Sequence, residues 1–379
     1  MSAVSIIIPS YNCGHFLPQT LDSVFNQTFQ DFEVIVIDDG STDDTGSIVS
    51  RYLDRVKYLS QTNQGPSAAR NNGIRESESE FLVFLDADDI VLPVKLEAQT
   101  KALNEHTDWG VVYSAWQYIN QLGVPIMPAV RPKKEGHLLK EWLLRSFFFP
   151  PGCALVRRDC LQTCGFFDED LRAAEDTDLW TRLALAGYYF GYIDEVLFEY
   201  RISQGGLTSN YEKQIKNEYL RLDKFFAQPN LKEDILLLKP RAYAILKFEA
   251  AARYYQTAEI QAAQETMREA VQLCPDLVED KEWLLEWLAG AAMDPRVDEP
   301  AKLIDTVFNN LPPEITVLEK YHNKAIARYH AASAFSEYYN RNYTAVRPHV
   351  FPALFGDPAL FLNKGFLRLA FQALFSSPN

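Results

Sequence analysis

The sequence predicts an α/β protein whose doubly wound sheet is followed by a second region made only of helices. In the N-terminal half, short runs rich in β-branched residues alternate with helical patterns, which indicates buried parallel strands. After about Tyr211, alanines and aromatic residues recur at helical spacing and strand-like runs cease. The 379 residues also exceed the size of one comfortable core. We therefore expect two domains, at residues 1–210 and 211–379.

The expected elements alternate between strand and helix. In order, they are a strand at 4–8, a helix at 16–26, a strand at 32–37, a helix after 45, a helix opened by Gly65 and Pro66, and a strand at 81–85. Two of these strands end in acidic loops, at Asp38-Asp39 and at Asp86 to Asp89. Because the carboxyl ends of parallel strands share one edge of a sheet, where such folds bind ligands, we expect these loops to lie together. Arg70, in the third helix, adds a cation to this edge.

Asp86 and Asp88 are the sharpest chemical signal in the chain. A buried strand that delivers two carboxylates to one side of its exit presents hard oxygen ligands. Such crowding of negative charge raises a carboxylate pKa or recruits a cation, so the pair predicts a divalent ion that carries a substrate diphosphate. The alternative is a polar turn, with Asp89 and Pro93 opening the next helix.

Five motifs follow one another in the first 201 residues. They are Ser5–Asn12 (SIIIPSYN), Asp38–Asp43 (DDGSTD), Ala69–Gly73 (ARNNG), Asp86–Asp88 (DAD) and Glu175–Trp180 (EDTDLW). In this order they resemble the inverting, nucleotide-sugar-dependent glycosyltransferases of family 2, which have the GT-A fold. The resemblance implies a GT-A type mixed sheet. It also implies transfer of a sugar from a nucleotide diphosphate, with UDP expected, to a hydroxyl of a glycan or a lipid-linked acceptor.

The resemblance assigns roles to single residues. It implies that Asp86 and Asp88 hold Mn²⁺ or Mg²⁺ and that Asp39 accepts the imide N–H of the base, which stacks on Pro9 and Tyr11. Arg70 is expected near the base and the phosphates, and the alternative for it is a salt bridge to a loop aspartate. The remaining residues expected at the nucleotide sugar are Asn12, Ser41, Ala87 and Trp180.

A general base must take the proton of the acceptor hydroxyl. By resemblance this base is Asp176, with Glu175 as its neighbour and Trp180 as the aromatic residue that follows. The alternative is electrostatic, because acids at a helix N-terminus are favoured by the helix dipole. Asp178 is expected to have a structural role.

The sequence departs from the family pattern after Tyr200-Arg201. The family often has a histidine shortly after this pair, but Ser203 stands there. We therefore expect weaker metal binding that depends more on the diphosphate. The Gln-x-x-Arg-Trp motif that processive synthases carry is missing from the sequence, which favours single additions.

The C-terminal region has small and large residues placed approximately as in a tetratricopeptide repeat. They are Ala251, Tyr254, Ala263, Met267, Ala270 and Pro275, with a weaker copy at Ala334, Tyr338, Ala353 and Pro358. Two roles remain open for this region: packing on the catalytic domain or forming a homodimer, and docking a protein partner. The amphipathic tail at 360–375, with two cations, is either buried against the preceding helices or an interfacial helix in peripheral contact with a membrane.

Composition narrows the class of protein further. A net charge of −14 argues against nucleic acid as a partner. The five cysteines form no Cys-x-x-Cys pair, and the sequence shows no signal peptide and no apolar run of about 18 residues. We therefore expect a cytoplasmic protein. The alternative is a protein bound peripherally at the inner face of the membrane. Two rival functions are a sugar-nucleotide pyrophosphorylase, which would open with a Gly-rich loop, and a helical adaptor that carries an inactive transferase domain.

Overall fold

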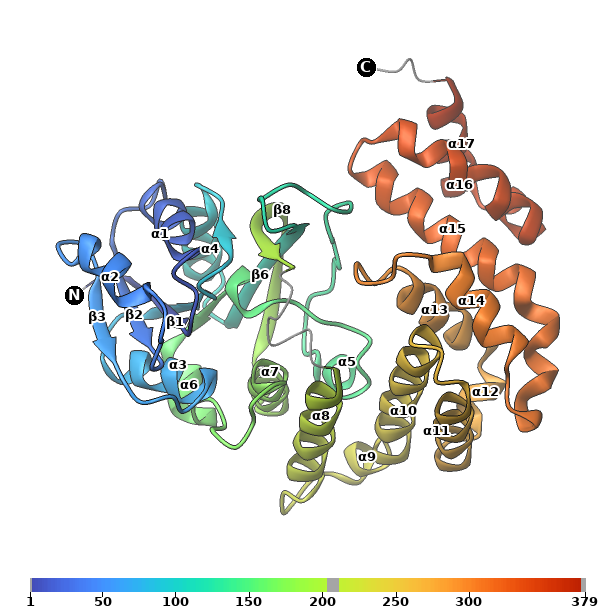
Figure 1. Cartoon of the computed structure of the whole chain (residues 1–379), viewed down its shortest axis with the longest axis horizontal. Helices are drawn as coiled ribbons and strands as arrows, with labels where there is room; N and C mark the ends of the chain where they lie inside the picture. Colours follow the sequence, from blue (N-terminus) through green and yellow to red (C-terminus); the bar gives the residue numbers. More distant parts are fainter. Residues whose placement is uncertain (1, 203–210, 376–379) are drawn as a thin grey trace. The chain divides into compact units, whose positions relative to one another are not determined.

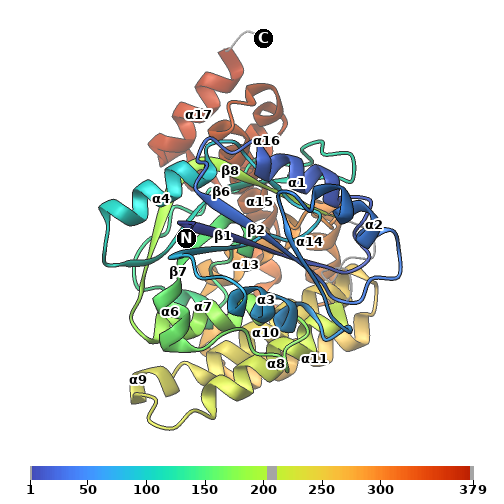
Figure 2. The same cartoon turned by 90° about the vertical axis from the view of Figure 1, so that its left-hand side faces the viewer.

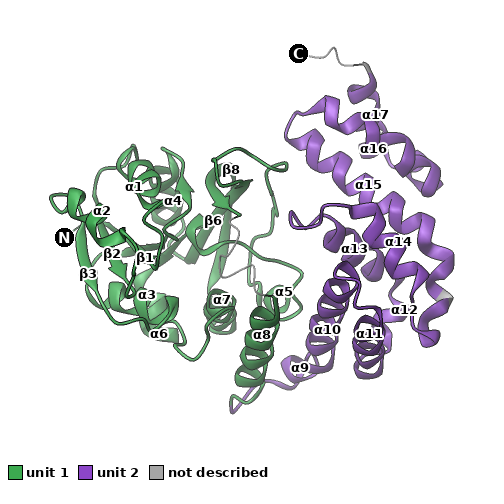
Figure 3. Cartoon of the chain, in the orientation of Figure 1, with its two compact units in different colours: residues 1–228 green, residues 229–379 purple. Residues whose placement is uncertain are grey.

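The computed structural model describes residues 2–202 and 211–375. The chain divides into two compact units, residues 1–228 and 229–379 (Figures 1 and 3). Unit 1 is a mixed sheet with helices on both faces, and the described part of unit 2 is entirely helical. The predicted fold class, α/β followed by an all-helical region, is confirmed.

Helix α8 (Tyr211–Phe226) belongs to unit 1, although the expected domain boundary at 210 assigns it to the second domain. Its polar residues explain this. Its buried Glu218 pairs with Arg145, which lies outside this helix, while the Asn217 side chain accepts a hydrogen bond of 2.9 Å from the backbone N–H of Arg172. Buried polar groups need such partners, and here the partners lie in unit 1. Helical periodicity cannot reveal that packing.

Eight strands form one sheet in the order β3-β2-β1-β4-β7-β6-β8-β5. They are β1 (Val4–Ser10), β2 (Phe32–Asp38), β3 (Lys57–Ser60), β4 (Phe81–Phe84), β5 (Ile90–Val91), β6 (Trp109–Ile119), β7 (Ala154–Arg157) and β8 (Tyr189–Arg201). The first four are parallel, and β7 is antiparallel to both of its neighbours. The sheet is therefore doubly wound and mixed, as predicted.

Helices cover both faces of this sheet, with α1 and α4 on one side and α3, α6 and α7 on the other (Figure 2). The helices of unit 1 that precede α8 are α1 (Leu17–Phe25), α2 (Thr45–Val49), α3 (Pro66–Arg75), α4 (Lys95–Glu105), α5 (Leu139–Leu143), α6 (Arg158–Cys164) and α7 (Glu175–Leu185), with 3-10 turns η1 (Ser50–Tyr52) and η2 (Pro151–Cys153). The central strands are buried on both faces, which explains their continuous apolar runs.

Close contact between α3 and β1 explains the glycine at the end of the third motif. A Cβ on Gly73 would lie 2.4 Å from Cγ2 of Ile7, a fully buried residue of β1. That distance is far below van der Waals contact, so the site accepts no side chain without displacement of the core. Gly73 therefore lets α3 lie directly on the sheet. Arg70 sits one turn earlier on the same helix.

Unit 2 contains two helix pairs of equal size. Helices α10 and α15 have 18 residues each, and the helices that follow them, α11 and α16, have 14 each. The elements are α9 (Glu233–Leu236), α10 (Lys239–Gln256), α11 (Ile260–Leu273), α12 (Asp276–Glu279), α13 (Lys281–Ala292), α14 (Pro300–Asn309), η4 (Pro313–Tyr321), α15 (His322–Tyr339), α16 (Tyr343–Gly356), η5 (Pro358–Leu362) and α17 (Lys364–Phe375). The two pairs coincide with the two predicted copies of the repeat pattern.

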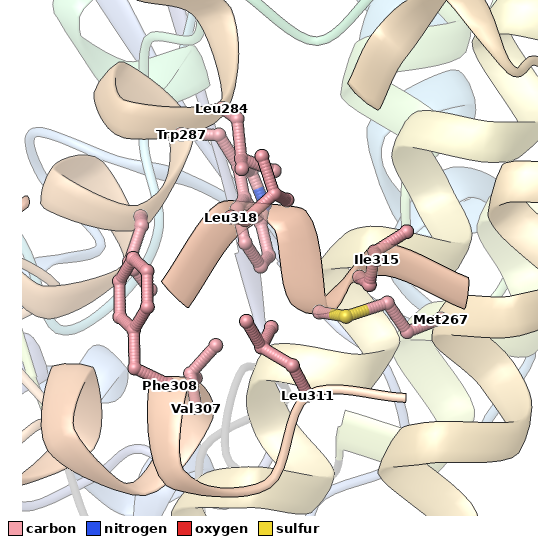
Figure 4. A pocket seen from close by; sticks show the side chains of 9 residues that line it. Met267, Leu284, Trp287, Val307, Phe308, Leu311, Ile315 and Leu318 are labelled. Atoms are coloured by element: carbon pink, nitrogen blue, oxygen red, sulfur yellow. The ribbon is translucent and has the colours of Figure 1, made fainter. Parts of the chain in front are cut away.

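The interior of unit 2 is closely packed. Figure 4 shows apolar side chains around a cavity of about 10 Å³, which come from α11, α13, α14, η4 and the segment before η4. A space of this size is at the lower limit for one water molecule, and only apolar surface lines it, so it is a packing defect and not a ligand site. Among the described residues, no helix combines the length and the apolar character needed to cross a membrane.

Candidate active site

The carboxyl ends of β1, β2 and β4 meet at one edge of the sheet. Ser10 at the end of β1 pairs with Asp38 at the end of β2, and Ile7 of β1 pairs with Phe84 at the end of β4. The backbone N–H of Asp39 continues the β1–β2 contact with a hydrogen bond of 2.8 Å to the Ser10 carbonyl. The acidic loops after β2 and β4 thus leave the same edge of the sheet, one on each side of β1.

Asn12 and Ser41 join the loops that follow β1 and β2. Asn12 has a left-handed backbone (φ 52°), which brings its side-chain oxygen to 2.8 Å from the backbone N–H of Thr42. Its own N–H donates to Oγ of Ser41 at 3.0 Å. Tyr11 is half exposed beside this junction. These contacts fix the loop that presents the Tyr11 ring to solvent. Asn12 and Ser41 therefore help to set the conformation of the loops at this edge of the sheet.

Asp39 is buried and already holds three donors. Its Oδ1 accepts hydrogen bonds from Nε2 of Gln61 (2.9 Å) and the backbone N–H of Gln64 (2.8 Å), and its Oδ2 accepts one from the backbone N–H of Gly65 (2.7 Å). A carboxylate has about four acceptor positions. Asp39 therefore anchors the loop before α3 and keeps one acceptor position, on Oδ2, for another donor.

Arg70 bridges two carboxylates that come from distant parts of the sequence. Its Nη1 donates to Oε1 of Glu175 at 2.6 Å and its Nη2 donates to Oδ1 of Asp86 at 2.7 Å. The Arg70 side chain is only 4% exposed, and its guanidinium lies 5.3 Å from the Phe167 ring centroid. Burial alone would lower the pKa of Arg70, but Asp86 and Glu175 reverse this and raise it above its usual range. The salt bridge to a loop aspartate is present.

Helix α3 also holds the segment that leads to Glu175. Ser67 donates from Oγ to the Leu171 carbonyl at 3.1 Å. The amide of Asn71 both donates to the Phe167 carbonyl and accepts from the Phe167 N–H, each at 2.9 Å. These bonds explain why the third motif carries Asn71 beside Arg70: one side chain fixes the segment and the other pairs with its acid.

The segment enters α7 through a strained residue. Ala174 has left-handed backbone angles (φ 61°, ψ 14°), which are uncommon for a residue with a Cβ. Its carbonyl accepts the first helical hydrogen bond, from the Asp178 N–H at 2.9 Å. Strain of this kind persists only where the surroundings enforce it, and it clusters at functional sites. Here it turns the chain so that Glu175 reaches Arg70.

Asp176 is held apart from this salt bridge. Its Oδ1 accepts from the backbone N–H of Thr177 at 2.7 Å, and its Oδ2 has no hydrogen-bond partner among the described residues. Burial, and then the negative charge of Glu175, raise the pKa of Asp176 to about 7. A carboxylate with that pKa can exchange a proton near neutral pH. Asp178 instead pairs with Arg182 at 2.8 Å, the structural role expected of it.

Two residues for which the sequence predicts no role in the site, Thr20 and Arg201, hold the Asp86–Asp89 turn in place. Thr20 donates to the carbonyls of Ala87 and Asp89, and Arg201 donates from Nε to the Asp88 carbonyl at 2.6 Å. The Arg201 N–H also donates to Oδ1 of Asp89 at 2.8 Å. Burial, followed by the charges of Asp88 and Asp86, raises the pKa of Asp89 well above its usual range. The signal in the sequence that could have indicated a role for Asp89 is that it is the third aspartate within four residues.

Two residues expected at the nucleotide sugar are not exposed to it. Trp180 is fully buried, with its ring 5.1 Å from that of Phe149. Ala87 is also buried, and its carbonyl accepts the hydrogen bond from Thr20. The aromatic residue of the fifth motif is therefore part of the core of unit 1, where it packs on Phe149. Ser203 lies outside the described residues.

The turn after β4 can be compared with what a divalent cation needs. No group of three or more His, Cys, Asp or Glu side chains within residues 2–202 and 211–375 is arranged as a complete metal site. Asp86, whose side chain is 31% exposed, and Asp88 supply two carboxylates. Mg²⁺ is commonly bound by one or two carboxylates together with substrate phosphates and water, and the residues present fit that mode.

Comparison with known proteins identifies the family. The sequence model of glycosyl transferase family 2 matches residues 5–165. An uncharacterized glycosyltransferase of Rickettsia prowazekii is 33% identical over 250 residues, which make up 64% of this chain and 77% of the relative. The chain belongs to glycosyl transferase family 2. The resemblance carried by the five motifs is confirmed, and the protein is a glycosyltransferase.

One further sequence relative and two solved structures are similar to this glycosyltransferase. A putative teichuronic acid biosynthesis glycosyltransferase of Bacillus subtilis, TuaG, is 29% identical over 221 residues, 57% of this chain and 85% of the relative. The structure of S. aureus TarS 1-349 in complex with UDP-GlcNAc covers 90% of this chain and 92% of its own, with a TM-score of 0.53 and 22% identity. The mannosyltransferase PcManGT from Pyrobaculum calidifontis, in complex with GDP-Man and Mn²⁺, has a TM-score of 0.52 at 20% identity and covers 82% of this chain and 87% of its own. The GT-A type fold is confirmed.

Replacement of Arg70 tests the buried bridge. Arg70→Met should reduce the free energy of unfolding by about 3 kcal/mol, because removal of one partner leaves uncompensated charge in a buried pair. The measurement is urea unfolding of the full chain. Arg75→Met is the matched control on the same helix: Arg75 is 58% exposed and pairs with Glu169 at 3.5 Å, so its loss should cost under about 1 kcal/mol. Equal losses in the two variants would contradict the bridge.

Proposed function

We propose that this enzyme transfers a single sugar, with inversion, from a UDP-sugar to a hydroxyl of a glycan or lipid-linked acceptor. The observation that carries the proposal is the salt bridge from Asp86 through Arg70 to Glu175. It joins the carboxylate motif after β4 to the N-terminus of α7, where Asp176 lies. A donor bound at the sheet edge would then stand close to a carboxylate able to take a proton. Relatives with solved structures bind UDP-GlcNAc and GDP-Man, which supports a nucleotide-sugar donor.

The single remaining acceptor position of Asp39 favours UDP as the nucleotide. Uracil offers one imide N–H on its pairing edge, whereas guanine offers an N–H and an amino group together. Gln61, Gln64 and Gly65 occupy the other positions of the carboxylate. The exposed Tyr11 and the adjoining Pro9 would form the wall on which the base stacks.

Asp86 and Asp88 would hold Mn²⁺ or Mg²⁺. When bound, the cation would offset the negative charge of the diphosphate leaving group. Oδ1 of Asp86 accepts a hydrogen bond from Arg70. Arg70 would therefore fix the orientation of this carboxylate and leave its Oδ2 to bind the cation. A side chain whose rotamer is set by a neighbour loses less freedom when substrate binds.

Asp176 would act as the general base. Its Oδ2 would take the proton from the acceptor hydroxyl as the acceptor oxygen bonds to the anomeric carbon and the bond to the diphosphate breaks. Attack opposite the leaving group inverts the anomeric centre. The pKa of about 7 suits this role, since a base is most effective when its pKa lies near the working pH. Glu175 contributes by raising that pKa and by holding Arg70.

The division of labour between the two units is also part of the proposal. Every residue assigned above lies in unit 1, so we assign catalysis to residues 1–228. The equal helix pairs α10–α11 and α15–α16 support a tetratricopeptide-like unit 2. Such a unit would dock a protein partner or a second copy of the chain.

The donor and its metal dependence can be tested by calorimetry on the purified chain. UDP should bind more tightly than GDP, and its affinity should rise when Mn²⁺ is added. Asp88→Asn should remove the Mn²⁺-dependent part of the affinity, since it replaces one of the two proposed carboxylate ligands with a neutral amide. Gln61→Ala, which frees a second acceptor position on Asp39, should narrow the preference for UDP over GDP. Tighter binding of GDP than of UDP by the unmodified chain would overturn the assignment of uracil as the nucleotide base.

The pH dependence of kcat/KM tests whether Asp176 is the general base. Below its pKa Asp176 is protonated and cannot accept a proton, so the rate should rise with pH through about 7. Glu175→Gln removes an adjacent negative charge that raises the Asp176 pKa, and it leaves the positive charge of Arg70 to lower it, so the rise should move to lower pH. Glu218 of α8 also raises this pKa and is unchanged in the variant.

The control for this measurement lies in the same turn of α7. Asp176→Asn should lower kcat by about 10² to 10⁴, the usual contribution of a general base, with little effect on UDP affinity. Asp178→Asn makes the same chemical change in a residue that pairs with Arg182, and it should leave the midpoint of the pH profile in place. A shift by Asp178→Asn with none by Glu175→Gln would contradict the assignment.

A further inference from the structure

The end of unit 2 exposes large apolar side chains on three adjoining elements. Phe355 of α16 is 78% exposed, Leu362 of η5 is 87% exposed and Phe371 of α17 is 65% exposed. Phe351 and Phe361 are more than half exposed beside them. Single exposed apolar residues are ordinary, but a concentration on neighbouring elements marks an interaction site. Figure 1 shows α15, α16 and α17 lying together at the red end of the chain.

Internal packing does not use this apolar surface. Helix α17 buries Phe366, Leu369 and Ala373 in a cluster that includes Val346 and Val350 of α16. Its opposite side carries Lys364, Leu367, Phe371 and Leu374, at the spacing of one helical stripe. The tail at 360–375 is thus packed on the preceding helices and is also apolar on its outer side. A helix that buries one side and exposes large apolar side chains on the other presents a surface suited to a partner.

The charges around the surface point to an anionic cover. The chain as a whole has a net charge of −14, yet residues 343–375 contain three cations, Arg347, Lys364 and Arg368, and the single carboxylate Asp357. Asp357 is occupied locally, where it accepts a hydrogen bond of 3.2 Å from the Ala359 N–H at the start of η5. Lys364 and Arg368 are exposed and form no ion pair with any described residue.

We propose that this surface, formed by the outer sides of α16, η5 and α17, binds the interface of a bilayer that contains anionic lipids. The phenylalanines and leucines would enter the boundary between headgroups and acyl chains, and Lys364 and Arg368 would lie among the lipid phosphates. A second copy of the chain is a less suitable partner for this surface. A symmetric pair would bring Lys364 and Arg368 of both copies to one interface, where Asp357 is the single carboxylate that each copy contributes from residues 343–375.

Co-sedimentation of the full chain with lipid vesicles tests the proposal. Binding should be strong to vesicles of phosphatidylcholine with phosphatidylglycerol, weak to phosphatidylcholine alone, and reduced by salt. The double variant Lys364→Glu/Phe371→Ser should lower the partition coefficient at least about tenfold. The matched control is Lys232→Glu/Leu237→Ser, which changes one exposed cation and one exposed leucine near α9 and should bind as the unmodified chain does.

Three results would overturn the proposal. One is equal loss of binding in the two double variants, and another is binding that does not depend on phosphatidylglycerol. The third is a dimer in solution, without lipid, that Phe371→Ser dissociates, which would make a second copy the cover. Arg368→Glu changes a single exposed side chain, so it repeats the test if the double variant is unstable, and it should weaken binding to the anionic vesicles. Donor binding at unit 1 is a separate measurement that these outcomes leave unaffected.

Discussion

The active site depends on one buried cation. Arg70 is the point at which the acidic edge of the sheet and the N-terminus of α7 are joined, through Asp86 at 2.7 Å and Glu175 at 2.6 Å. Several other features serve this contact. Gly73 lets α3 lie on β1, Asn71 and Ser67 tie the segment before α7 to α3, and Ala174 adopts a left-handed backbone that brings Glu175 to the guanidinium. Because a buried charge without partners is costly, each of these contacts is coupled to the others.

This arrangement also explains how two carboxylates in sequence, Glu175 and Asp176, acquire different properties. Glu175 pairs with Arg70, whereas Asp176 accepts only the backbone N–H and the hydroxyl of its neighbour Thr177. Burial and the charge of Glu175 then raise the pKa of Asp176 to about 7. The bridge therefore sets both the position and the proton affinity of the proposed base.

The sequence predicts the parallel strands, their shared edge and the family, because each depends on local patterns. Apolar runs identify β1, β2 and β4, and the acidic loops after β2 and β4 then meet by topology alone. Contacts between distant segments are not predictable in this way: Arg70 and Glu175 are 105 residues apart, and no periodicity connects them. The burial of Trp180 and the place of α8 in unit 1 were missed for the same reason. The aspartate run indicated a ligand edge but not the separate environment of Asp89, which depends on Arg201 from β8.

A double-mutant cycle on Arg70 and Glu175 tests most directly whether Arg70 acts through the bridge. The measured quantity is kcat/KM for the unmodified chain, Arg70→Met, Glu175→Gln and the double variant, with the UDP-sugar that the enzyme accepts. If the two residues act as a unit, the double variant should be little worse than the poorer single variant, with a coupling energy of about 1 to 3 kcal/mol. Losses that simply add would show that Arg70 and Glu175 contribute independently, and would contradict the account in which one buried cation joins the donor edge to the base.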